Sequence, residues 1–306
     1  MSMRGSPWVV SQRTGVFFAL FSLYVIWGST YLAMRFAVKA LPPLLMAGAR
    51  FLLAGVILMA LVRWRGVALP TRKQWGSSAI VGVCFFFMGN GFVAIAMASE
   101  RASSGLAAVA CAMTPLWLAL LRSVTGERLR SRECFGLVLG FVGVLILSAA
   151  GKRSYADVAP LALLLAGPLS WAVGSFLGRR LDLPASFMAP AAQMIAGGAL
   201  MLVVGLATGD RWPAVVPARS LFAFAYLVVF GSLVAFSSFN YLLRTARPAV
   251  TMSYAYVNPA VAVILGALFG AESVGPGMFL AMALVTASVL MMSWSPKQKK
   301  AYVVPE

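Results

Sequence analysis

Histidine is absent from this sequence of 306 residues, and only eight residues are acidic. The acidic residues lie near the ends of apolar runs, in the connections between them or in the C-terminal tail. Membrane-embedded hydrolases and transferases need a nucleophile with a base, or a metal held by histidine and carboxylates. The apolar runs offer neither set. The sequence therefore argues against an enzyme, and we predict no catalytic residue, no metal and no cofactor.

Cysteine is equally scarce. Of the three cysteines, Cys84 and Cys111 lie within apolar runs and Cys134 begins another. These positions provide neither a disulfide framework nor a CxxC metal site. The GxxxxGK[ST] loop is missing as well, so nothing in the sequence indicates the use of ATP.

Apolar residues, by contrast, make up 61% of the chain, and the mean hydropathy is +0.89. They form runs of roughly 20 residues, the length that crosses about 30 Å of hydrocarbon. Lipid offers no hydrogen-bonding partners, so such runs must be helical. The first run is too long for a signal-peptide core and should remain in the mature chain. We predict an all-α polytopic membrane protein with ten transmembrane helices, at residues 14–36, 43–62, 75–98, 103–121, 132–150, 158–178, 186–207, 221–243, 249–269 and 275–294.

The net charge of +17 comes from basic residues in the short connections between these runs. In such places positive charge fixes topology, and we predict no nucleic-acid partner. With the N-terminus inside, the tails and alternate connections hold seventeen basic residues. The opposite connections hold seven: Arg35, Lys39, Arg101, Lys152, Arg153, Arg211 and Arg219. The sequence therefore predicts a plasma (bacterial inner) membrane protein whose tails, 1–13 and 295–306, both face the cytoplasm.

The two halves of the chain resemble each other. At a shift of 144 residues, Ala102, Pro115 and Gly126 align with Ala246, Pro259 and Gly270. A shift of 142 aligns a second set upstream, including Met46 with Met188 and Ala54-Gly55 with Ala196-Gly197. Self-similarity at a fixed period indicates duplication. We predict two five-helix repeats, at 14–150 and 158–294, each with one apolar run broken at Thr114-Pro115 or Asn258-Pro259.

Five is an odd number, so the second repeat must enter the membrane from the opposite side to the first. Inverted repeats of this kind are typical of secondary transporters, which bind their substrate near the midplane between the repeats. The parity therefore predicts a central cavity and alternating access.

Several short motifs resemble those of a known family. They are Trp27-Gly28-Ser29, Pro43 followed by Gly48-Ala49-Arg50-Phe51, and Pro115 followed by Gly126-Glu127. In this order, on a duplicated five-helix scaffold, they resemble the drug/metabolite transporter superfamily, and its ten-helix EamA-type exporters, including the YddG-like amino-acid exporters, most closely. The resemblance covers nearly the whole chain. It implies inverted repeats around a cavity and export of amino acids or related metabolites, but it does not name the solute.

Aromatic and polar side chains in the middle of predicted spans mark a candidate binding site, because a polar atom buried without a partner is costly. In the first span, Tyr24, Trp27 and Tyr31 share one helix face. At a shift of 144, their counterparts in the sixth span are Pro168, Trp171 and Ser175. We expect these residues to line the cavity. The alternative is packing against lipid or at the membrane interface.

The ninth span carries Tyr254 and Asn258 on one face, together with Thr251. Pro259 lacks a backbone donor and frees a carbonyl in the preceding turn. The first-repeat counterparts are Ala107, Ala110 and Thr114, so the two sides of the cavity would differ. A kinked helix whose polar groups bond to their own neighbours is the alternative.

Other candidates are Asn90 in the third span, Ser237 in the eighth span, with Asn240 three residues later on the same face, and Trp117, one turn beyond Pro115. Each could instead bond to a neighbouring helix. Apart from Arg35 and Arg132 at span ends, Arg50 is the only basic residue within a predicted span, and its guanidinium could hold a carboxylate in a bidentate fork. Its place in the family motif favours a structural role instead, in which it snorkels outward or bonds to carbonyl oxygens at a helix end. Glu127 and Glu272 precede predicted helix starts and are expected to be structural.

These observations together predict an alternating-access exporter of small neutral metabolites, principally amino acids, including aromatic or apolar ones. Proton-driven carriers usually keep acidic or histidine relays within the membrane, so we expect facilitated diffusion without obligatory proton coupling. The alternatives are a proton-coupled drug/metabolite antiporter, a lipid-moving protein and a scaffold. We expect a monomer whose partners are its small-molecule substrate and the lipid bilayer.

Overall fold

The computed structural model describes residues 12–99, 102–126, 131–150, 158–246, 248–251, 253–272 and 274–293. These residues form helices and the turns between them, with no strand in the ranges given. Seven helical segments within them are long and apolar enough to cross a membrane. Two shorter apolar helices, Val257–Phe269 and Pro276–Met291, and the 20-residue helix Ser131–Ala150 complete the ten expected segments. The predicted all-α architecture is confirmed.

The first repeat comprises the helices of the five N-terminal spans. Its elements are α1 (Gln12–Ser22), η1 (Leu23–Trp27), α2 (Gly28–Ala37), α3 (Pro43–Trp64), α4 (Arg72–Gly82), η2 (Val83–Gly91), α5 (Phe92–Ala98), α6 (Ser104–Cys111), α7 (Thr114–Val124) and α8 (Ser131–Ala150). The second repeat consists of α9 (Val158–Gly178), α10 (Met188–Ala207), α11 (Ala218–Tyr226), η3 (Leu227–Val234), α12 (Ala235–Thr245), α13 (Pro248–Thr251), α14 (Tyr254–Phe269) and α15 (Pro276–Ser293).

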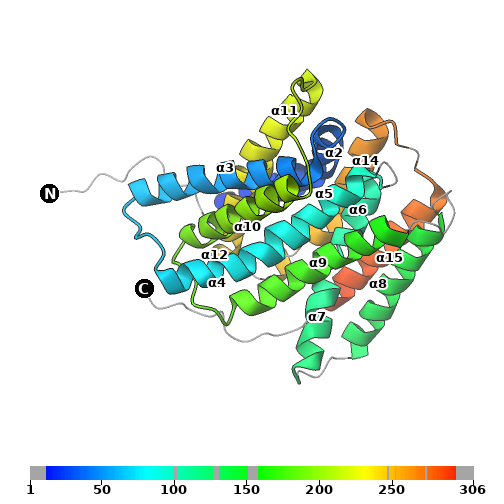
Figure 1. Ribbon diagram of the computed structural model, residues 1–306. Helices are drawn as coiled ribbons and strands as arrows, with labels where there is room; N and C mark the ends of the chain where they lie inside the picture. The colour runs from blue at the N-terminus through cyan, green and yellow to red at the C-terminus, as the bar shows by residue number, and fades with distance from the viewer. Residues whose placement is uncertain are drawn as a thin grey trace.

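Helices at equivalent positions in the two repeats pack against each other. The pairs are α3 with α10, α6 with α14 and α8 with α15. Other contacts come in matched sets: α1 packs against α12 as α9 packs against α5, and α2 packs against α14 as α9 packs against α7. Figure 1 shows α3, α10, α4 and α9 running side by side. This is the packing expected of two repeats related by a pseudo-twofold axis, with α3 and α10 beside that axis.

Glycines let the α3 and α10 backbones touch. A Cβ on Gly198 would lie 2.6 Å from the backbone nitrogen of Leu52 and 2.9 Å from the carbonyl oxygen of Gly48. A Cβ on Gly55 would lie 2.9 Å from the carbonyl oxygen of Ala191. Close approach at small residues is the usual way in which transmembrane helices pack, because lipid supplies no hydrophobic drive between them.

Three spans contain π-helical turns that the sequence did not predict. The two longer stretches, η2 and η3, begin at Val83 and Leu227, which are 144 residues apart. Their sequences differ, yet the same widened geometry recurs at the same position of each repeat. π-Helical turns are rare and often occur at functional sites. Because η2 and η3 lie at equivalent positions, we attribute them to the shared architecture of the repeats.

The predicted helix breaks differ between the repeats. In the first repeat the interruption lies at Ala112–Met113, and Pro115 occupies the first turn of α7, where no amide donor is needed. In the second repeat the prediction was wrong. Asn258-Pro259 lies inside α14, and the interruption precedes Tyr254. Pro259 is only the sixth residue of α14, so its missing donor affects the first turn and leaves the rest of the helix intact.

Glu272 joins the two repeats at one end of the bundle. Its carboxylate pairs with Arg35 of α2 and accepts a bifurcated hydrogen bond from the backbone N–H of Ser104, whose nitrogen lies 2.9 and 3.1 Å from the two carboxylate oxygens. Glu272 thus stabilises a helix start, as a carboxylate there should, but that helix is α6 of the other repeat, not the helix that follows Glu272. The first-repeat equivalent, Glu127, lies outside the described residues.

We predict that Glu272→Gln lowers the stability of the folded protein by about 1–3 kcal/mol, because it leaves a partly buried arginine without its counter-charge. The measurement is the midpoint of thermal unfolding in detergent. Asp182→Asn is the matched control, since Asp182 and its partner Lys73 are exposed and such pairs contribute about 0–1 kcal/mol. Equal effects of the two substitutions would contradict the prediction.

Candidate functional site

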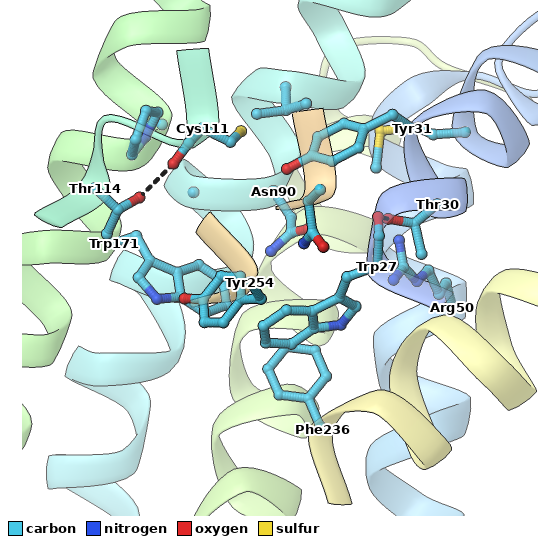
Figure 2. Close-up of a pocket in the computed structure, with 16 residues that line it drawn as sticks. Trp27, Thr30, Tyr31, Arg50, Asn90, Cys111, Thr114, Trp171, Phe236 and Tyr254 are labelled. Carbon is cyan, nitrogen blue, oxygen red and sulfur yellow. Dashed lines mark hydrogen bonds between the residues drawn. The ribbon is translucent and has the colours of Figure 1, made fainter. Parts of the chain in front are cut away.

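A cavity lies where the two repeats meet. It encloses about 700 Å³ of empty space, including its opening. Seven spans contribute to its wall, four from the first repeat and three from the second. The lining residues are Trp27, Thr30, Tyr31, Met34, Arg50, Gly89, Asn90, Val93, Cys111, Thr114, Gly167, Pro168, Trp171, Phe236, Tyr254 and Asn258. Figure 2 shows their side chains converging from helices far apart in the sequence.

Seven of the eleven candidate residues from the sequence line this cavity: Trp27, Tyr31, Arg50, Asn90, Trp171, Tyr254 and Asn258. Trp27 and Trp171, which occupy equivalent positions in the repeats, are both among them. The structure thus brings together groups from η1, α2, α3, η2, α9 and α14 that the sequence separates by up to 231 residues.

Aromatic rings form one continuous wall. The ring centroids of Trp27 lie 5.0 Å from Tyr254 and 5.3 Å from Phe236. Phe236 in turn lies 6.1 Å from Trp171, which stacks on Phe85 at 4.5 Å. In Figure 2 the rings of Trp27, Phe236, Tyr254 and Trp171 gather on one side of the space, opposite Tyr31. Such a wall offers π faces to a flat or apolar solute.

Several polar groups in the lining are bonded to their own helices. Thr30 donates to the carbonyl oxygen of Trp27 at 2.6 Å, and Thr114 donates to that of Cys111 at 2.8 Å. Asn90 donates through Nδ2 to the carbonyl oxygen of Phe85 at 3.0 Å. That acceptor lies five residues back, within the π-helical η2. These groups are therefore held in fixed orientations at the edge of the cavity.

Two other lining residues have buried atoms with no partner among the described residues. Arg50 is 3% exposed, and its Nη1 has no acceptor. Asn258 is 5% exposed, and its Oδ1 has no donor. Buried polar atoms are normally satisfied, so each exception requires an explanation. Here both residues line the same cavity, one on each repeat.

Four candidates lie outside the lining. The Tyr24 hydroxyl is 2.5 Å from Ser253 Oγ, and Ser175 donates to the carbonyl oxygen of Trp171 at 2.9 Å. Trp117 packs edge-on against Phe141, with ring centroids 5.4 Å apart, in a separate apolar cluster. Ser237 is half-buried and is absent from the lining. The sequence suggested the hydroxyl groups of Tyr24 and Ser175 for binding a solute. In the structure both hydroxyls are engaged in hydrogen bonds within the helix bundle.

The lining also contains residues that sequence reasoning missed: Thr30, Met34, Gly89, Val93, Cys111, Gly167 and Phe236. Thr30 lies three residues after Trp27, so helical spacing could have found it. Gly89 and Gly167 mark a close approach, since a Cβ on Gly167 would lie 2.8 Å from the Gly89 carbonyl oxygen. A single sequence gives no signal for such a contact.

The cavity is equipped for binding. Its lining holds aromatic, hydroxyl and amide groups, one thiol and one guanidinium, and none of the lining residues is acidic. No group of three or more histidine, cysteine, aspartate or glutamate residues that could hold a metal occurs within the described ranges. A solute here would meet hydrogen-bonding groups and rings without an acid–base pair.

Several known proteins are similar to this chain in sequence. The chain is 37% identical over 282 residues to a protein of Escherichia coli K12 named "Uncharacterized inner membrane transporter YedA", with 92% of each chain covered. It is 25% identical to "Uncharacterized transporter YvbV" of Bacillus subtilis, with 95% of each covered. It is 28% identical to a Chlamydia trachomatis protein named "S-adenosylmethionine/S-adenosylhomocysteine transporter", covering 88% of this chain and 86% of that one.

A solved crystal structure shares the fold, with a TM-score of 0.65 at 21% identity, covering 92% of this chain and 96% of that one. The model of the EamA-like transporter family matches the chain twice, at residues 13–149 and 159–294. With its two matched repeats and its relatives named as transporters, this chain belongs to the EamA-like transporter family and is a membrane transporter.

Proposed function

We propose that this protein is an alternating-access exporter of small neutral metabolites, with amino acids as its principal substrates, in a bacterial inner membrane. The observation that carries the proposal is the cavity between two inverted repeats. A site on a pseudo-twofold axis can open to either side as the repeats rock against each other. The excess of basic residues on one side of the predicted topology supports an orientation with both tails in the cytoplasm.

The chemistry of the lining supports an amino acid as the solute. Rings on one wall suit an apolar or aromatic side chain, and Arg50 and Asn258 supply polar groups. The absence of carboxylates in the lining disfavours dications, and a single guanidinium is too little charge for polyphosphates. One relative is named for S-adenosylmethionine and S-adenosylhomocysteine, both of which carry an amino-acid group.

Transport would be driven by the solute's own gradient. None of the lining residues is an acid or a histidine that could carry a proton at mid-depth. Glu272, which is 6% exposed in its side chain, is committed to Arg35 and Ser104 at the end of the bundle. The lining therefore supports facilitated diffusion.

Of the predictions that test this proposal, the first concerns the aromatic wall. In liposomes that contain the purified protein, efflux of radiolabelled amino acids should saturate with concentration. Trp27→Ala and Trp171→Ala should each raise KM by about tenfold, since each removes ring contacts worth about 1 kcal/mol or more. Trp64→Ala is the control, because Trp64 is 85% exposed at the end of α3. Unchanged KM in both cavity variants would overturn the assignment of this wall to the solute.

The second prediction concerns the energy source of transport. We expect an imposed pH gradient across the liposome membrane to leave the final distribution of the amino acid unchanged, although it should still equilibrate. The measurement is the ratio of internal to external label at steady state. Accumulation that follows the size and sign of the pH gradient would instead establish proton coupling.

The third prediction uses the native thiol in the lining. With Cys84 and Cys134 replaced by alanine and serine, a small methanethiosulfonate reagent should label Cys111, and a transported amino acid should slow that labelling. Mass spectrometry measures the modified fraction over time. The variant that retains only Cys134, which is exposed on the outside of the bundle, is the control and should show no protection. Labelling of Cys111 unaffected by any transported solute would contradict the prediction.

A further inference from the structure

We propose that Arg50 recognises the carboxylate of the transported solute. This inference rests on the proposed transport of amino acids and names the residue that selects for one end of them. Arg50 lies on α3, seven residues beyond its first residue Pro43, and lines the cavity. At the shift of 142 residues that relates α3 to α10, its counterpart is the fully buried Ala192. The cavity thus has a cationic group on one side of the pseudo-twofold axis only.

The contacts of Arg50 fix its position without neutralising its charge. Its Nε donates to the Ser232 hydroxyl at 2.9 Å, and its guanidinium carbon lies 4.5 Å from the ring centroid of Phe51. Neither partner is charged. The ion pairs Arg35–Glu272 and Lys73–Asp182 lie at other places in the fold. A buried cation without an anion is expensive, typically by several kcal/mol.

The contacts of Arg50 differ from those of the structural role expected from the sequence. A guanidinium that snorkels would be exposed at its tip, whereas Arg50 is 3% exposed. One that caps a helix end would bond to carbonyl oxygens, whereas Arg50 Nε bonds to a hydroxyl. That hydroxyl donates in turn to the carbonyl oxygen of Leu227 at 3.1 Å, five residues earlier in η3. The π-helical segment therefore orients Ser232, and Ser232 orients the guanidinium.

With Nε engaged, the Nη1–Nη2 edge of the guanidinium remains for a ligand. Nη1 has no acceptor, and a Cβ added to the neighbouring Gly231 would lie 3.0 Å from Nη2. Gly231 also accepts a hydrogen bond from Trp27 Nε1 at 3.3 Å. Gly231 thus lies beside both the guanidinium of Arg50 and the ring of Trp27 in the aromatic wall. A carboxylate matches two parallel N–H groups of a guanidinium edge, which a hydroxyl or an amide oxygen does not.

The test compares an amino acid with its own carboxamide, which keeps the side chain and the ammonium group but removes the negative charge. Efflux of the twenty standard amino acids from liposomes identifies the one that is transported fastest, and its carboxamide is then measured beside it. Wild-type protein should transport the acid at least about tenfold better than the amide in kcat/KM, as expected when a charge-assisted fork is lost. Arg50→Gln should abolish this preference by slowing the acid alone.

Arg50→Lys keeps the charge without the fork and should retain a reduced preference. Lys73→Gln, which removes an exposed cation, is the matched control and should behave as wild type. Equal transport of acid and amide by wild-type protein, or a preference that survives in Arg50→Gln, would overturn the inference. The wild-type comparison decides the question even if Arg50→Gln does not fold. If none of the twenty amino acids is transported, the proposed function itself is wrong.

Discussion

The constraint on which this structure depends is the cost of a polar atom in hydrocarbon. Each spanning backbone satisfies its own amides by forming a helix, so polar groups at mid-depth are side chains with a specific reason to be there. Most of those described are bonded to a nearby carbonyl, as Thr30, Thr114 and Ser175 are. Arg50 and Asn258 are exceptions that line the cavity. A protein accepts that cost where a ligand restores the missing interactions.

Duplication and inversion explain why the cavity lies where it does. Equivalent helices pair along the axis, α3 with α10, α6 with α14 and α8 with α15. The remaining spans of each repeat then wrap around the partner repeat. The π-helical stretches η2 and η3 begin at equivalent positions and widen the third and eighth spans. The shared backbone geometry is therefore built twice, while the side chains that it presents differ between the two sides.

Much of the fold could be predicted from the sequence, because span length, charge and internal repetition are each dictated by the bilayer or by the duplication. The candidate site was predicted less completely, and the reasons are local. Helical periodicity placed Tyr24 and Trp27 on one face, but it cannot show that the Tyr24 hydroxyl contacts Ser253. On the eighth span polarity favoured Ser237, whereas Phe236 lines the cavity. A face counted at 3.6 residues per turn shifts after a π-helical stretch such as η3.

The difference between the two sides of the cavity matters for the proposed alternating access, in which one solute is held in two conformations. Trp27 and Trp171 are equivalent by symmetry, so either conformation can offer an aromatic face. The cationic group is not duplicated, since Arg50 corresponds to Ala192. It lies on α3, which packs along its own counterpart α10 beside the axis. Under the proposed mechanism, Arg50 would hold one end of the solute while the aromatic walls of the two repeats exchange around the other.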